Sequence, residues 1–257
     1  MPKGDYQKIV SSQNAQIKLL EKLNIKKYRE QLKQFLVENL AIILDGLNDN
    51  YDFEALFVTE EFMDKHPEKL AYIESKSQCQ NYYLIDSKLN KQYSSLDTPS
   101  GITAIYSQPD KKLDESSVVY LNSINDPGNL GAIMRSALAF DFRNLVLDDN
   151  CVDIYNPKVI SAAKEAIFKL NIIEDKTGAW LADNKLPVYV TSSHQGDDLA
   201  VFKPAKLFCL VLGSESHGVS SEIMKIAKAN IKINISAQLE SLNVATAAAI
   251  LFYELRR

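Results

Sequence analysis

The 257-residue sequence lacks the features of a secreted or membrane-spanning chain. Its first eight residues, MPKGDYQK, contain no apolar stretch of the kind that a signal peptide needs. The longest apolar run, near Val244–Tyr253, is far shorter than the ~20 residues of a membrane-spanning helix. We therefore expect a protein that does not enter a membrane.

Cysteine and histidine are also scarce. The three cysteines are scattered and odd in number, which argues against a disulfide framework and favours a reducing cytoplasm. The three histidines lie far apart, and no Cys/His pair has the spacing of metal ligands. The sequence thus predicts a cytoplasmic protein without a structural metal.

Internal repeats and low-complexity tracts are absent, and the composition, 46% hydrophobic and 24% charged, is that of a globular protein. The length fits one large domain or two smaller ones. A Gly-x-Gly-x-x-Gly string does not follow the first expected strand of either half. Its absence argues against one possible function, that of a dinucleotide-binding or flavodoxin-like enzyme.

Positive charge is concentrated at one end of an acidic chain. The net charge is −4, yet residues 1–34 carry eight Lys/Arg and three acidic residues, a local charge of +5. Phosphate binding depends on where cations lie rather than on their total. This segment is either a solvated helix face or a surface for nucleic acid.

The first part of the chain alternates between helical and extended patterns. Ile17, Leu20, Leu23 and Ile25 predict one helix face within 17–34. Strands are expected at 35–37, 55–59, 82–85 and 101–107, and helices at 38–47, 60–74 and 87–93. The polar, proline-containing segment 109–117 is interpreted as a linker, which gives an N-terminal domain at 1–108 and a second domain at 118–257.

Strands and helices continue to alternate after this linker. Continuous apolar strands such as Leu207–Leu212 are typical of a parallel sheet covered on both faces. The expected fold class is therefore α/β, with ligand sites at the carboxyl ends of the strands. The expected elements of this domain are 118–122, 129–140, 144–147, 157–167, 170–173, 188–191, 207–212, 220–227, 231–235 and 241–256.

Three strings each follow a short apolar strand: Asn129–Arg135 (NLGAIMR), Gly213–Gly218 (GSESHG) and Glu240–Arg257 (ESLNVATAAAILFYELRR). Each is weak alone. In this order they resemble the SpoU (TrmH-like) family of knotted (SPOUT) RNA 2′-O-ribose methyltransferases. The strings 9–14, 35–38 and 98–102 are similar to those of the family's small RNA-binding domain.

The resemblance implies a C-terminal parallel-sheet α/β domain with a deep trefoil knot, and a smaller N-terminal α/β domain that binds RNA. It also implies S-adenosylmethionine as cofactor, a ribose 2′-hydroxyl as methyl acceptor, and a homodimer in which the C-terminal helix packs against the partner. Ribosomal RNA is the favoured substrate, and transfer RNA is the alternative.

Site residues follow from the same resemblance. The implied catalytic set is Asn129, Arg135, Glu215, Ser241 and Asn243. The implied cofactor-binding set is Thr191, Leu212, Gly213, Ile233, Leu242 and Asn243. Because an arginine stays protonated, Arg135 suits phosphate anchoring and stabilisation of a developing alkoxide better than general-base chemistry.

RNA contacts are expected from Lys18, Lys26, Lys27, Arg29 and Arg135. The chain also departs from the family's usual strings: Ser161 replaces a cation, Glu165 replaces a glycine, and Asn234 replaces a proline. These departures motivate an alternative function, a non-catalytic knotted factor for RNA binding or ribosome assembly.

Overall fold

The computed structural model describes residues 5–192, 195–214 and 217–256. These residues form two compact units, which we describe separately. The N-terminal unit contains the chain up to Pro109 together with Tyr155–Ser161, and the C-terminal unit contains Asp110–Ile154 and the chain from Ala162. Residues 110–117 of the expected linker thus group with the C-terminal unit.

The N-terminal unit is built on a mixed five-stranded sheet with the order β1-β4-β3-β5-β2. The first three of these strands run parallel, while β5 is antiparallel to both of its neighbours. The strands are β1 (Gln7–Lys8), β2 (Gln34–Val37), β3 (Ala55–Thr59), β4 (Tyr82–Ile85) and β5 (Ile102–Ser107).

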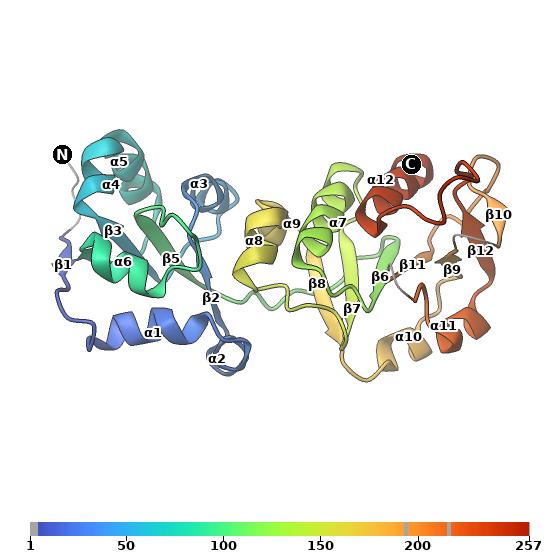
Figure 1. Ribbon diagram of the computed structural model, residues 1–257, viewed down its shortest axis with the longest axis horizontal. Coiled ribbons are helices and arrows are strands. Elements are labelled where there is room, and N and C mark those ends of the chain that lie inside the picture. Colours follow the sequence, from blue (N-terminus) through green and yellow to red (C-terminus); the bar gives the residue numbers. More distant parts are fainter. Residues whose placement is uncertain (1–4, 193–194, 215–216, 257) are drawn as a thin grey trace. The chain divides into compact units, whose positions relative to one another are not determined.

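Helices lie on both sides of this sheet, with α1 opposite α3 and α5 (Figure 1). On one side, Ile17, Leu20 and Leu23 of α1 join Leu89 and Tyr93 of α6 in the hydrophobic core. The helices are α1 (Ala15–Leu23), α2 (Lys26–Leu32), α3 (Leu40–Asn48), α4 (Glu60–Lys65), α5 (Pro67–Lys76) and α6 (Ser87–Tyr93).

Two helices that the sequence pattern predicts as single are each divided. The expected helix 17–34 breaks at Ile25, which has extended backbone angles and a 53% exposed side chain, so its predicted place on the buried face is wrong. The expected helix 60–74 breaks at His66, because the ring of Pro67 disfavours helical angles in the residue before it.

The C-terminal unit contains a seven-stranded sheet, in the order β10-β12-β9-β11-β6-β7-β8, in which every pairing is parallel. This confirms the predicted fold class, a parallel α/β domain beside a smaller N-terminal one. The implied knot stays a prediction. The strands are β6 (Val118–Asn122), β7 (Asn144–Asp148), β8 (Asn171–Asp175), β9 (Val188–Thr191), β10 (Asp197–Asp198), β11 (Cys209–Gly213) and β12 (Ala229–Lys232).

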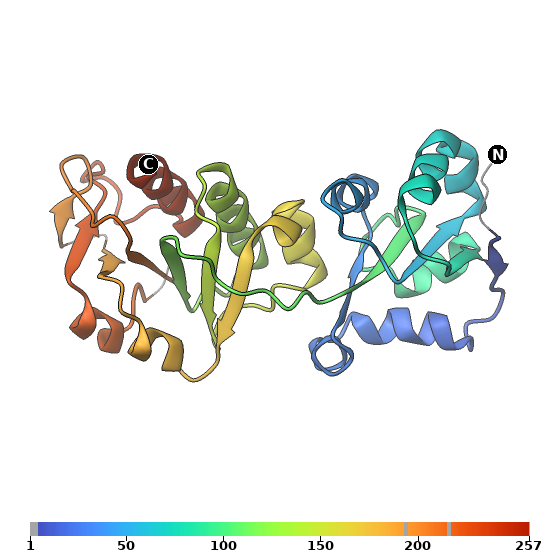
Figure 2. The same ribbon diagram turned by 180° about the vertical axis from the view of Figure 1, so that it is seen from behind.

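Helices α7 and α12 lie on one side of this sheet, and α10 and α11 lie on the other (Figures 1 and 2). The latter pair covers a core that includes Val118, Cys209, Leu181 and Ile223. The helices described after β6 are α7 (Pro127–Ala139), α8 (Pro157–Ala163), α9 (Ala166–Lys169), α10 (Ala179–Asp183), α11 (Ser221–Ile226) and α12 (Val244–Leu255). Most of α8 belongs to the stretch Tyr155–Ser161, which groups with the N-terminal unit. None of the helices in the described ranges is long and apolar enough to cross a membrane.

The first motif lies in α7, and the start of this helix is fixed by an N-cap and a proline. The Asp126 carboxylate accepts a hydrogen bond from the Asn129 N–H at 2.8 Å, and Pro127 occupies the first turn, where an N–H is not needed. Gly131 allows close packing, because a Cβ there would lie 2.4 Å from the Ala162 Cβ. These two features fix where α7, which carries Asn129 and Arg135, begins and how closely it packs.

Candidate functional site

A pocket of about 450 Å³ opens at the carboxyl ends of three neighbouring strands. Thr191 ends β9, Gly213 ends β11, and Ile233 directly follows β12. The volume lies within the range of about 300–1,000 Å³ that small-molecule sites occupy. The lining residues are Thr191, Ser192, Gly213, Ser214, His217, Gly218, Val219, Met224, Ile231, Ile233, Ile235, Glu240, Ser241, Leu242, Val244, Ala247 and Leu251.

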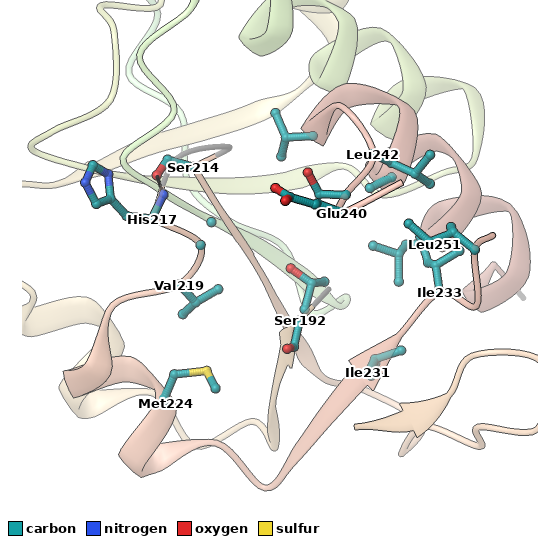
Figure 3. A pocket seen from close by; sticks show the side chains of 17 residues that line it. Ser192, Ser214, His217, Val219, Met224, Ile231, Ile233, Glu240, Leu242 and Leu251 are labelled. Carbon is teal, nitrogen blue, oxygen red and sulfur yellow. Dashed lines mark hydrogen bonds between the residues drawn. The ribbon is translucent and has the colours of Figure 1, made fainter. Parts of the chain in front are cut away.

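Apolar side chains form two opposite walls of the pocket (Figure 3). Val219 and Met224 lie on one side, while Ile233, Leu242 and Leu251 lie on the other. Polar side chains also line the pocket, namely those of Thr191, Ser192, Ser214, His217, Glu240 and Ser241. Such a site suits a flat, partly apolar ligand that also carries polar groups.

The segment after β11 folds back tightly against its own start. The Gly218 N–H donates to the Ser214 carbonyl oxygen at 2.8 Å, and Gly218 has a positive φ of 66°. A Cβ on Gly213 would lie 2.1 Å from the Gly218 carbonyl carbon and 2.3 Å from the Val219 nitrogen. Glycine is therefore required at position 213 by the approach of backbone rather than by its own φ.

A side-chain hydrogen bond joins the first and third motifs. Asn243 is the N-cap of α12, and its Oδ1 accepts from the backbone N–H groups of Ala245 and Thr246. Its Nδ2 donates to Asn129 Oδ1 at 2.9 Å, across 114 residues of sequence. The second and third motifs meet in the pocket, since Gly213, Ser241 and Leu242 all line it. All three motifs are thus brought together.

Other predicted residues lie near the pocket in different ways. Arg135 is exposed on α7, six residues beyond Asn129. Leu212 is 1% exposed, so its side chain belongs to the core, one residue before the lining Gly213. Glu215, which we predict to be catalytic, lies outside the described residues.

The expected RNA-binding residues of the N-terminal unit divide into two groups. Lys18, Lys26 and Lys27 are exposed on α1 and α2. Arg29 is only 3% exposed, and its guanidinium donates to the Leu23 carbonyl oxygen at 2.8 Å. The expectation that Arg29 contacts RNA from an exposed cationic face is therefore corrected. Its charge instead satisfies a carbonyl at the end of α1, where helices leave acceptors without intrahelical partners.

Several lining residues were not predicted. Val244, Ala247 and Leu251 lie on one face of α12, and their helical spacing was a usable signal. Glu240 directly precedes Ser241, so the third motif already pointed to it. By contrast, Ser192 and Met224 have no recognisable local pattern and reach the pocket only through the order of the strands.

Nucleophilic thiol chemistry is not available from the two buried cysteines. Burial is the main cause that raises the pKa of Cys151 and of Cys209 to about 12, so both stay protonated near neutral pH. A group of three or more His, Cys, Asp or Glu side chains suited to a metal ion is absent from residues 5–192, 195–214 and 217–256.

Comparison with known families identifies the domain that contains this pocket. The model of the SpoU rRNA methylase family matches residues 116–253, which include every residue that lines the pocket. The chain belongs to the SpoU rRNA methylase family. A second family model, the MRM3-like substrate-binding domain, matches residues 14–104. Membership of the SpoU family makes the chain an RNA methyltransferase, which confirms the resemblance inferred from the three motifs.

Similar SpoU proteins cover the chain almost completely. The Bacillus subtilis 23S rRNA (guanosine(2553)-2′-O)-methyltransferase RlmP is 29% identical, with 96% of this chain and 98% of RlmP aligned. The human mitochondrial rRNA methyltransferase 3 is 26% identical over 90% of this chain and 69% of its own. A TrmH-family structure from Porphyromonas gingivalis is 30% identical, with a TM-score of 0.82, 97% of this chain covered and 99% of that one.

Proposed function

We propose that this chain transfers a methyl group from S-adenosylmethionine to a ribose 2′-hydroxyl of ribosomal RNA. The observation that carries the proposal is the meeting of the three motifs. Gly213, Ser241 and Leu242 line one pocket, and Asn243 beside it bonds to Asn129. Two relatives, RlmP and the mitochondrial rRNA methyltransferase 3, bear names that state ribosomal RNA methylation, and the RlmP name specifies a 2′-oxygen.

The pocket fits S-adenosylmethionine in size and in chemistry. Its apolar walls, with Ile233 and Leu242 on one side, suit the faces of an adenine. Thr191 and Gly213, which also line the pocket, are our candidates for contact with the polar edge of the adenine. A Sinorhizobium meliloti rRNA methyltransferase determined with this cofactor has the same fold, with a TM-score of 0.83 at 22% identity. When bound, the cofactor supplies an activated methyl group.

The chain's own residues would then hold and orient the acceptor. Asn243 fixes the side chain of Asn129 through the 2.9 Å hydrogen bond, so a ribose hydroxyl would meet a preset polar group. The exposed guanidinium of Arg135 suits bidentate binding of a phosphate and stabilisation of a developing alkoxide. Glu215 and Ser241 complete the proposed catalytic set. Positioning of this kind supplies roughly 7–11 kcal/mol of barrier reduction in favourable cases.

The N-terminal unit is the proposed RNA-binding domain, and its match to a substrate-binding model supports this role. Lys18, Lys26 and Lys27 place three exposed cations on two consecutive helices, α1 and α2. Neutralised phosphates release counterions, so RNA affinity should fall steeply with salt. We also propose that the protein acts in the cytoplasm, which its three free cysteines favour.

A homodimer is the proposed assembly. Thr246, Ile250 and Tyr253 follow one another at helical spacing along α12, and Tyr253 is 52% exposed. An aromatic ring at the surface of a helix is a common anchor of subunit interfaces. This stripe is our candidate for the contact with the partner subunit.

Methyl transfer with radiolabelled S-adenosylmethionine tests the proposed function. The purified native chain should label ribosomal RNA in preference to transfer RNA, and the label should map to a ribose 2′-oxygen. Arg135→Ala should lower the rate by about 100-fold or more, the usual cost of removing a group that stabilises transition-state charge. Arg143→Ala is the matched control, because Arg143 is exposed and paired with Asp141 just before β7, at the opposite end of the strands from the pocket.

The outcomes separate the alternatives. Preferential labelling of transfer RNA would replace the substrate assignment. Absence of labelling by a native chain that still binds ribosomal RNA would favour the non-catalytic factor that Ser161 and Glu165 motivate. Equal labelling by the native and Arg135→Ala chains would remove Arg135 from the catalytic set.

A further inference from the structure

Asn122 is a buried polar residue at the edge of the pocket that the proposed chemistry does not use. It is the last residue of β6 and is only 6% exposed. In the parallel pairing of β6 with β11, Asn122 is the register partner of Gly213, which lines the pocket. A buried amide at this position needs hydrogen-bond partners, because leaving a buried polar group unpaired costs roughly 1–3 kcal/mol.

Both ends of the amide have partners of fixed polarity. Asn122 Nδ2 donates to Asp148 Oδ2 at 2.7 Å, and Asn122 Oδ1 accepts from the Ser220 N–H at 2.8 Å. A carboxylate can only accept and a backbone N–H can only donate, so the amide has one possible orientation. The three residues therefore form a directional chain of hydrogen bonds from the end of β7, through the end of β6, to the start of α11.

Asp148 also holds the backbone at this corner. Both of its carboxylate oxygens accept from the Ser123 N–H at 3.0 Å. Ser123 has a positive φ of 62°, a conformation that a non-glycine residue adopts at a cost. The backbone turn at Asn122 and Ser123 is therefore stabilised by hydrogen bonds to Asp148 of β7, and not by the intrinsic backbone preference of Ser123.

The other end of the chain of hydrogen bonds reaches the pocket wall. Ser220 directly follows His217, Gly218 and Val219, all of which line the pocket. The hydrogen bond from the Gly218 N–H to the Ser214 carbonyl oxygen joins two residues of the same loop after β11. The bond to Asn122 instead ties the segment to a different strand, across 98 residues of sequence.

We propose that Asn122, oriented by Asp148, is a positioning residue that holds residues 217–220 against the pocket and thereby sets the affinity for the cofactor. The inference rests on the proposed function, since it takes this pocket as the S-adenosylmethionine site. It adds a residue that none of the three motifs contains.

Asn122→Asp tests the direction of the hydrogen bonds from Asp148 to Ser220, with almost no change in side-chain size. The new carboxylate still accepts from Ser220, but it places a negative oxygen where the amide donated to Asp148. We expect the dissociation constant for S-adenosylhomocysteine, measured by calorimetry, to rise by about tenfold, the equivalent of one hydrogen bond. The double variant Asn122→Asp with Asp148→Asn restores one donor and one acceptor, and should return the affinity to within about threefold of native.

Asn144→Asp is the matched control. Asn144 is also fully buried in the same sheet, and its Nδ2 donates to Asp114 Oδ1 at 2.7 Å. It lies at the amino end of β7, the end away from the pocket. This variant should lower the melting temperature but leave the affinity for S-adenosylhomocysteine unchanged below that temperature. A purely structural role of Asn122 would give the same result at both positions.

Each outcome decides the proposal. A native affinity in Asn122→Asp, an equal loss in Asn144→Asp, or a double variant as weak as the single one would overturn it. If Asn122→Asp does not fold, Asp148→Ala alone tests the same link, because it removes the acceptor of the Asn122 amide without bringing two carboxylates together. Unchanged affinity in that variant would also overturn the proposal. A native chain that does not bind S-adenosylhomocysteine would instead refute the proposed function, and the inference with it.

Discussion

At the scale of single residues, Gly213 is the position where the smallest change should have a large effect. An added methyl group would meet the backbone of Gly218 and Val219 at 2.1–2.3 Å, and backbone cannot move aside as a flexible side chain can. We expect Gly213→Ala to displace the segment that forms the pocket wall. Overpacking of this kind costs typically 1–3 kcal/mol, so binding of S-adenosylhomocysteine should weaken by about tenfold or more in calorimetry.

Gly128→Ala provides the control for this prediction. A Cβ at Gly128 would approach only the Asp126 side-chain oxygen, at 3.1 Å, and the residue lies in the first turn of α7. Its affinity for S-adenosylhomocysteine should match that of the native chain. Native affinity in Gly213→Ala would contradict the close backbone approach described here.

Residues of the site differ in how far sequence could predict them. Gly213 and Leu242 lie within motifs, so their chemistry is visible in a short string. Asn122 was not predicted, because its partners Asp148 and Ser220 are 26 and 98 residues away. Arg29 was wrongly predicted to contact RNA. The sequence shows its charge, but it does not show that the guanidinium is buried against the Leu23 carbonyl oxygen.

At the scale of elements, Asn243 combines two roles that can be separated. It caps α12 through Oδ1 and contacts α7 through Nδ2. Asn243→Asp keeps an acceptor at the N-cap, where aspartate is equally favourable, but removes the donor to Asn129. We expect an unchanged melting temperature and a methyl-transfer rate at least about tenfold lower, because Asn129 must then turn its amide end toward position 243.

Asn243→Ala is the companion variant, since it removes both the cap and the link. Losing an N-cap costs typically ~1 kcal/mol, which corresponds to a decrease in melting temperature of about 2–4 °C for a chain of this size. If Asn243→Asp transferred methyl groups at the native rate, the hydrogen bond between α12 and α7 would have no part in the reaction.

Element positions were predictable where a pattern was uniform. The strands expected at 55–59, 82–85, 118–122 and 188–191 have those same bounds in the structure, because each is an apolar run with at most one polar residue, which stands at its end. The helix expected at 157–167 is instead divided into α8 and α9, and Lys164 between them has a positive φ of 56°. The short strands β1 and β10, each of two residues, are too brief to leave a pattern in the sequence.

At the scale of the whole molecule, the sequence predicts the fold class better than the connections between elements. Alternating apolar strands and helices indicate a parallel sheet. They do not determine that β11 lies between β6 and β9, or that β12 lies between β9 and β10. That strand order brings Thr191, Gly213 and Ile233 to one pocket. Only the resemblance of the motifs to those of the SpoU family predicted that these residues share a site.

The proposed homodimer makes a prediction for the complete chain. Light scattering coupled to size-exclusion chromatography should give a mass near twice that of the 28.9 kDa chain. Tyr253→Glu should shift the protein toward the monomer mass, because it places a charge in the centre of the proposed contact, where charged residues are depleted. The fold should tolerate this change, since Tyr253 is 52% exposed in the single chain.

Ala182→Glu introduces the same charge at an exposed position of α10, and should leave the mass unchanged. A native chain that elutes as a monomer at all concentrations would refute the proposed assembly. A dimer that survives Tyr253→Glu would place the contact elsewhere than on α12. Methyl transfer by a monomeric Tyr253→Glu chain would show that one subunit is sufficient for the reaction, because the pocket and Asn129 both lie within a single chain.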